Sequence, residues 1–188
     1  VLTKDGVLVA RHENEISGTT DVAARPEFAA RKATKVIDGE AVTGWFTEDF
    51  TLAELKTLRV RERLPQLRPA NRAFDGEEAI PTLGEILALV KEAEATTGRR
   101  IGIYPETKHP SYFRGIGLPL EERLLKDLAD AGYGAASDPV FIQSFEVGNL
   151  EDLRKRTRLR LIQLMAKDGG PVDRPGLRYA DMALPAGL

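Results

Sequence analysis

A carboxylate and an amine follow an apolar, strand-like run in this sequence. Glu106 and Lys108 come directly after the stretch that begins at Ile101 and ends at Pro105. Side chains two residues apart on a strand share a face, so we expect both groups to emerge together where a strand meets a loop. The functional groups of α/β folds gather at such strand ends. A carboxylate can bind a hard divalent cation, and a lysine can neutralise a phosphate oxygen.

Two further strand ends carry polar groups. His12 and Glu13 follow one apolar run, and Gln143 and Glu146 lie at the end of another. In a βα barrel, residues from several strand ends converge on one mouth. Histidine can protonate a leaving alkoxide near neutral pH. Together with the first pair, these groups predict metal-assisted cleavage of a phosphoester.

Each of these groups also has a purely structural interpretation. His12 suits an ordinary histidine after a hairpin. Glu106 and Lys108 suit a solvated ion pair of little energetic weight. Gln143 and Glu146 suit plain polar residues at a strand end. Spacing alone does not decide between these interpretations.

Composition restricts the class of protein. The chain has 188 residues, of which 42% are hydrophobic and 30% charged, which is typical of a soluble globular protein with one sizeable core. Its net charge is −2 with both signs interspersed, which argues against nucleic acid as a partner. No apolar run approaches the length of a membrane span. The absence of cysteine excludes disulfides, thiolate metal sites and a cysteine nucleophile.

The first half of the sequence predicts few regular elements. Two extended segments flank an Asp5-Gly6 turn. Residues 13 to 50 show no clear period, so we expect mostly a long loop there. A Thr-x-x-Glu capping box at Thr51 predicts a short helix, and residues 60 to 80 are again irregular.

The second half alternates helix and strand. A second capping box at Thr82 predicts a helix that ends near Gly98. We expect strands over residues 101 to 108, 140 to 146 and 159 to 165, and helices over 119 to 131 and from an Asn149 cap to about 157. Such repeated βα units predict parallel strands with right-handed crossovers, in a barrel or an open sheet. No Gly-x-Gly-x-x-Gly follows a strand, which argues against a dinucleotide-binding fold.

Several stretches resemble the glycerophosphodiester phosphodiesterase family, in particular its periplasmic bacterial branch. The more specific stretches are the opening block, which ends in Val9-Ala10-Arg11-His12-Glu13, and Ile103-Tyr104-Pro105-Glu106-Thr107-Lys108. Supporting stretches are residues 19 to 23, 49 to 58, 80 to 83 and 143 to 146. They occur in the order of the family and cover most of the chain.

The resemblance implies a TIM-type (β/α) barrel that hydrolyses glycerophosphodiesters to an alcohol and glycerol 3-phosphate. It implies a divalent cation, Ca²⁺ or Mg²⁺, held by three carboxylates, and a periplasmic or secreted location. By the same resemblance, His12 is the acid for the leaving alcohol, Glu106 is the third metal ligand, and Lys108 is the catalytic lysine near the phosphate. Gln143 and Phe145 border the pocket as substrate-binding residues.

The pattern of the family extends beyond this chain at both ends. A His-Arg-Gly strand and a Glu-x-Asp pair of metal ligands precede the stretch that matches Val1, and the last barrel strands follow the stretch that matches Tyr179. We therefore expect residues 1 to 188 to form one partial barrel domain, with a loop insertion at about 13 to 50. With one carboxylate of three, this chain alone is expected to be inactive or nearly so, since Ca²⁺ takes about 6–8 oxygen ligands. The natural protein that contains it, which we call the parent protein, is expected to be active.

Two other functions stay open at this point. A related barrel phosphodiesterase that acts on lysophospholipid or sphingomyelin would share these features, and tests with a substrate panel would separate it. A non-catalytic binding fragment is the alternative from a different class. The sequence leaves the head-group preference, the metal and the oligomeric state undetermined.

Overall fold

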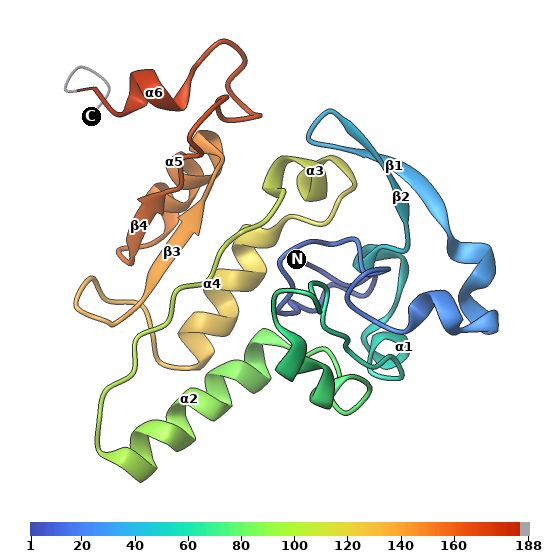
Figure 1. The fold of residues 1–188 in the computed structure, drawn as a ribbon. Coiled ribbons are helices and arrows are strands. Elements are labelled where there is room, and N and C mark those ends of the chain that lie inside the picture. Colours follow the sequence, from blue (N-terminus) through green and yellow to red (C-terminus); the bar gives the residue numbers. More distant parts are fainter. Residues whose placement is uncertain (185–188) are drawn as a thin grey trace. The chain divides into compact units, whose positions relative to one another are not determined.

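The chain divides into two compact units. The computed structural model describes residues 1–184 and is drawn in Figure 1. The first unit is Val1–Glu85 and the second is Ile86–Leu188, so the boundary falls within helix α2 (Leu83–Thr97). No helix within residues 1–184 is long and apolar enough to cross a membrane.

The first unit begins with a short antiparallel pair around a tight turn, as predicted. Leu2 and Leu8 form an antiparallel bridge, and both side chains are buried. The amide of Gly6 donates to the carbonyl oxygen of Thr3 at 2.9 Å, with a φ of 78° at the glycine. A glycine adopts this left-handed conformation without steric cost.

The prediction that residues 13 to 50 are mostly loop is wrong. Strands β1 (Ala33–Ile37) and β2 (Glu40–Gly44) pair there as an antiparallel hairpin (Figure 1). Asp38 and Gly39 connect them with φ values of 52° and 86°, as a type I′ turn requires. The same region holds the 3₁₀ helices η1 (Val22–Ala24), η2 (Pro26–Arg31) and η3 (Thr47–Asp49).

Helix α1 (Leu52–Leu55) carries the predicted capping box. The hydroxyl of Thr51 accepts from the amide of Glu54 at 3.3 Å, and Oε2 of Glu54 accepts from the amide of Thr51 at 2.9 Å. An aromatic cluster lies nearby in sequence: the rings of Phe28 and Phe50 meet edge to face at 5.0 Å, and Nε1 of Trp45 donates to the carbonyl oxygen of Phe28 at 2.7 Å. Helix η4 (Pro69–Phe74) is exposed along its length.

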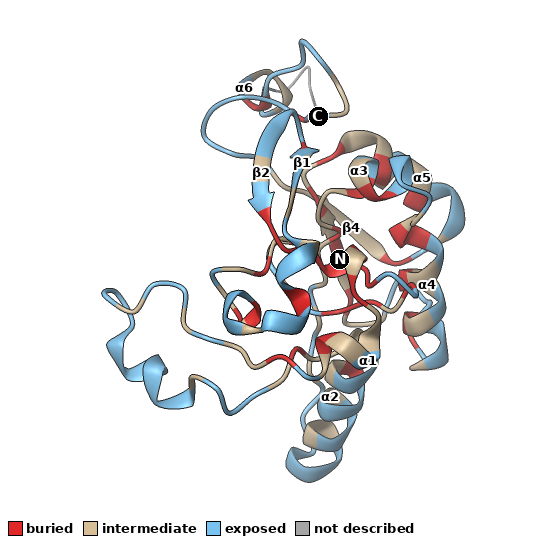
Figure 2. Ribbon diagram, turned by 90° about the vertical axis from the view of Figure 1, so that its right-hand side faces the viewer, coloured by how far each residue is buried: buried red, intermediate tan, exposed pale blue. Residues whose placement is uncertain are grey.

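Two predicted helices are present in the structure: α2, which spans the boundary between the units, and α4, which belongs to the second unit. The capping box between Thr82 and Glu85 opens α2, whose only buried residue is Leu87. Helix α4 (Leu120–Asp130) buries the apolar stripe Leu120, Leu124 and Leu128. Figure 2 shows that α4 has both buried and exposed parts. Spacing of four residues places these leucines on one helix face.

The parallel part of the second unit consists of neighbouring extended segments. Strand β3 (Phe141–Ser144) pairs in parallel with β4 (Arg160–Gln163), and α5 (Val147–Arg156) is the crossover between them. On the opposite edge of β3, residues 103 to 107 form two parallel bridges rather than the predicted continuous strand. Pro105 interrupts the ladder because it has no backbone N–H. Residues 1–184 contain two sheets of two strands each and no closed barrel.

In this unit, one helix was missed from the sequence and one helix cap was misplaced. Helix α3 (Pro110–Gly115) was not predicted; its N-cap residue is His109, with a φ of 53°. Asn149, expected to cap α5, lies inside the helix, and the N-cap position belongs to Glu146. The carboxylate of Asp173 instead accepts from the first amides of α5, those of Val147 at 3.2 Å and Gly148 at 2.6 Å. The chain continues to α6 (Tyr179–Met182).

Candidate active site

Glu106 lies at the second of the two parallel bridges formed by the 103–107 segment. Glu106 bridges to Gln143, and the amide of Gln143 donates to the carbonyl oxygen of Pro105 at 2.9 Å. Within residues 1–184, Oε1 of Glu106 is buried and has no hydrogen-bond partner. Burying an acceptor without a donor is costly, so this oxygen is suited to a ligand supplied from outside these residues.

Lys108 and Phe145 lie close together. Nζ of Lys108 lies 5.7 Å from the centroid of the Phe145 ring, just inside the range of cation–π contacts. The ring of Phe145 also meets that of Tyr179 at 6.2 Å, close to edge-to-face. The ammonium group of Lys108 thus lies beside an aromatic ring that follows β3.

The side chain of Gln143 forms a hydrogen bond to the neighbouring extended segment. Its Nε2 donates to the carbonyl oxygen of Tyr104 at 3.2 Å. The side chain therefore spans from β3 to the neighbouring extended segment and supports the residue two positions before Glu106. Glu106, Lys108, Gln143 and Phe145 all belong to the second unit, whereas His12 belongs to the first.

His12 forms a pair with the adjacent carboxylate. Its Nδ1 lies 2.9 Å from Oε1 of Glu13, and the histidine side chain is 70% exposed. A carboxylate at Nδ1 orients the ring and leaves Nε2 for proton transfer. The preceding Arg11 is largely desolvated: burial, and then the charge of Arg63, lower the pKa of Arg11. Its Nε is buried without a hydrogen-bond partner among the described residues.

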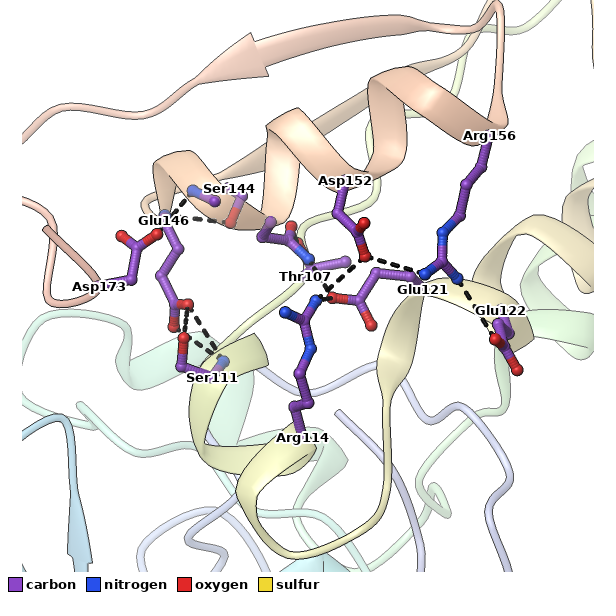
Figure 3. A network of polar contacts seen from close by, with 12 residues as sticks. Thr107, Ser111, Arg114, Glu121, Glu122, Ser144, Glu146, Asp152, Arg156 and Asp173 are labelled. Carbon is purple, nitrogen blue, oxygen red and sulfur yellow. Dashed lines mark hydrogen bonds and ion pairs between the residues drawn. The ribbon is translucent and has the colours of Figure 1, made fainter.

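Glu146 serves as a structural anchor. This carboxylate is 3% exposed and accepts from the amide of Ser111 at 3.1 Å and from the Ser111 hydroxyl (Figure 3). It ties the first turn of α3 to the start of α5.

A second set of contacts, which the sequence did not reveal, lies behind the Glu106–Lys108 pair. The hydroxyl of Thr107 donates to Oδ1 of Asn149 at 2.6 Å, and Nδ2 of Asn149 donates to Oε1 of Glu121 at 2.7 Å. Arg114 donates to the same oxygen of Glu121 at 2.5 Å. Thr107, Asn149 and Glu121 are 4%, 3% and 1% exposed.

The part of the chain that the structure describes does not gather a complete set of metal-ligating side chains. Residues 1–184 contain no group of three or more His, Cys, Asp or Glu side chains placed to hold a metal ion. Glu106, with its unpartnered buried oxygen, fits one ligand position of a cation.

The sequence as a whole matches one protein family. Residues 1–181 match the Glycerophosphoryl diester phosphodiesterase family, and the chain belongs to this family. Glycerophosphodiester phosphodiesterase GDPD6 of Arabidopsis thaliana is 36% identical over 160 residues, which cover 79% of this chain and 41% of that protein. A glycerophosphodiester phosphodiesterase of Haemophilus influenzae is 31% identical over 180 residues, which cover 88% of this chain and 47% of that protein. The chain therefore spans less than half the length of these relatives.

Solved structures share the fold. A Silicibacter pomeroyi protein assigned as a glycerophosphoryl diester phosphodiesterase superposes with a TM-score of 0.62 at 21% identity, over 93% of this chain and 56% of that one. An Oleispira antarctica phosphodiesterase, solved with the product sn-glycerol-3-phosphate, gives a TM-score of 0.55 at 20% identity, over 88% of this chain and 52% of that one. These neighbours have the TIM-type barrel fold, and the chain matches about half of each.

Proposed function

We propose that the parent protein hydrolyses glycerophosphodiesters to an alcohol and glycerol 3-phosphate. Family membership over residues 1–181 supports this reaction class. The observation that carries the proposal is the buried oxygen of Glu106, which has no donor among the described residues and stands two positions from Lys108. A carboxylate that awaits a cation, next to an amine suited to a phosphate oxygen, matches the needs of phosphodiester cleavage.

The side chains of this chain divide the work in the proposed reaction. Lys108 binds a phosphate oxygen, and the ring of Phe145 with the backbone around Gln143 borders the substrate. His12 gives a proton from Nε2 to the alcohol oxygen as its bond to phosphorus breaks, while Glu13 holds Nδ1. In the net reaction, water supplies the oxygen that replaces the alcohol on phosphorus and the proton that the alcohol gains. Glu106 would hold Ca²⁺ or Mg²⁺, which would stabilise negative charge on the phosphate when bound.

The described strands are proposed to be one part of a TIM-type barrel. Three neighbouring parallel segments, residues 103 to 107, β3 and β4, with helical crossovers are the arrangement that such a barrel repeats. The length of the relatives supports further strands in the parent protein. The periplasmic or secreted location implied by the resemblance is likewise a proposal, which cell fractionation of the native organism would test.

The test uses the parent protein with glycerophosphocholine as substrate. We expect release of glycerol 3-phosphate that stops on chelation with EDTA and returns with Ca²⁺ or Mg²⁺. Glu106→Gln removes one anionic ligand and should lower metal-dependent turnover by about 100-fold or more. Glu122→Gln, on a side chain that is 74% exposed, is the matched control and should keep it.

Several results would contradict the proposal. Wild-type turnover in Glu106→Gln would show that this carboxylate is not a required metal ligand. Release of phosphocholine instead of glycerol 3-phosphate would contradict the assigned product. Cleavage of lysophospholipid or sphingomyelin without cleavage of glycerophosphocholine would favour the related phosphodiesterase activity.

A further inference from the structure

We propose that Thr107 and Asn149 are positioning residues that fix Glu106 and Lys108 for catalysis. This inference rests on the proposed function, because it assigns the pair to the reaction described above. It concerns contacts within the second unit alone. The anchor network, as we call it, consists of the buried side chains of Thr107, Asn149 and Glu121 and the half-exposed side chain of Arg114. Figure 3 labels Thr107, Glu121 and Arg114.

The first step is the alternation of side chains at the strand end. Successive side chains on an extended segment point to opposite faces, so Thr107 faces away from Glu106 and Lys108. Its side chain is buried, and its amide donates to the carbonyl oxygen of Gln143 at 3.0 Å. A residue held by both backbone and hydroxyl restricts the direction in which its two neighbours project.

The second step is the directionality of the network. The Thr107 hydroxyl donates to the oxygen of the Asn149 amide, and the nitrogen of that amide donates to Glu121. Only one orientation of the amide satisfies both neighbours. The guanidinium of Arg114 neutralises the buried carboxylate at 2.5 Å. The strand end is thereby linked to α5 through Asn149 and to α4 through Glu121.

The third step is a second anchor on the other side of Lys108. Glu146, at the N-cap of α5, accepts from the amide and the hydroxyl of Ser111. Lys108 thus lies in a three-residue span between Thr107 and Ser111, and both ends of the span are bound by side chains at the start of α5. Releasing one anchor should let the side chains of Lys108 and Glu106 shift.

The experiment compares four variants of the parent protein. Thr107→Val keeps the shape and removes the hydroxyl, and Thr107→Ser keeps the hydroxyl. Asn149→Asp places a second carboxylate against Glu121. Thr20→Val is the matched control, because this 2% exposed threonine donates to the carbonyl oxygen of Ile16 at 2.8 Å in the first unit.

Two readouts are taken for each variant: kcat and KM with glycerophosphocholine, and amide hydrogen exchange across residues 105 to 111. Thr107→Val and Asn149→Asp should lower kcat by about 10- to 100-fold, since displacing a reacting group by 1 Å has effects of this size. Their exchange across residues 105 to 111 should become faster. Thr107→Ser and Thr20→Val should stay close to wild type in both readouts. If Thr107→Val does not fold, Asn149→Asp decides.

The failure of this inference differs from the failure of the proposed function. Unchanged exchange in both disruptive variants would overturn the inference, whatever their activity. Faster exchange with wild-type kcat would also overturn it, because the network would then be structural only. If the wild-type parent protein cleaves no glycerophosphodiester, the proposed function fails, and exchange alone decides whether the anchor network fixes this segment.

Discussion

An ion pair between Arg31 and Glu54 connects η2 to the first turn of α1. One guanidinium nitrogen donates to Oε2 of Glu54 at 2.9 Å, and the other contacts Oε1. The side chains are 34% and 31% exposed. The hydrogen bond from Arg31, followed by that from the amide of Thr51, lowers the pKa of Glu54 from 4.5 to about 2. Glu54→Gln removes this charge and keeps the shape of the side chain.

The pKa sets the size and the pH range of the effect. A separation of about 2.5 pH units corresponds to about 3 kcal/mol at most. Because both side chains are about one-third exposed, solvent screening should reduce this to about 1–2 kcal/mol. The pKa of Glu54 is lower in the folded state, so its stabilisation is complete above pH 4.5 and is lost as the pH falls towards 2.

The assay is urea unfolding followed by tryptophan fluorescence. Trp45 is the only tryptophan in the sequence, is 7% exposed, and lies in the same unit as Glu54. We expect Glu54→Gln to lower the free energy of unfolding of this unit by about 1–2 kcal/mol at pH 7. The difference from wild type should shrink as the pH is lowered below 4.5.

A matched control is available on η2, the 3₁₀ helix that also holds Arg31. Glu27 is 54% exposed and lies 3.9 Å from Arg25, so Glu27→Gln should change stability little. Equal stabilities of the Glu54 and Glu27 variants at pH 7 would refute the reasoning. So would a deficit in Glu54→Gln that stays constant from pH 7 to pH 3.

Two further predictions concern the stability of the second unit. Phe113→Ala empties a fully buried position and should cost about 3–5 kcal/mol in urea unfolding followed by circular dichroism, whereas Leu89→Ala, at 59% exposure, should change it by less than about 0.5 kcal/mol. Gly132→Ala should cost about 1 kcal/mol in thermal unfolding, because Gly132 ends α4 with a φ of 85°. Gly134→Ala, where the backbone is not left-handed and a Cβ meets nothing within 4 Å, should be nearly neutral, and equal losses at the two glycines would contradict the conformational argument.

Elements with strong local signals were predictable from the sequence. The capping boxes at Thr51 and Thr82 form the contacts that their spacing indicates. The leucine stripe of α4 is buried, and Gly132 ends that helix. In each case the decisive interactions join residues within a turn or two of each other, so a short stretch of sequence contains the necessary information.

The errors have identifiable physical causes. Asp38-Gly39 is a strong hairpin signal, but the alternation of apolar residues beside it is weak, since β1 and β2 are largely exposed. Helix α3 was missed because it is short. The proline at its first turn, a position that proline favours, was the available local signal. The strand predicted over residues 101 to 108 is interrupted because Pro105 has no backbone N–H to donate to the ladder.

The candidate site was only partly predictable. Glu106 and Lys108 follow from residue type and spacing, and the structure places Lys108 beside Phe145. The anchor network could not be found in this way. Thr107 and Asn149 are 42 positions apart, and Asn149 and Glu121 are 28 apart, so their pairing depends on how α4, α5 and the 103–107 segment pack. No local pattern distinguishes Asn149 from the helix cap that it resembles.

The left-handed backbone of His109 limits which sequences can occupy this position. With φ 53° and ψ 46°, it adopts a conformation that asparagine, aspartate and glycine tolerate and that β-branched residues resist. The position directly follows Lys108 and precedes a proline, which restricts its backbone further. Natural substitutions here should therefore be selected by backbone shape rather than by charge. A histidine next to a candidate catalytic lysine can thus persist for conformational reasons, with no part in proton transfer.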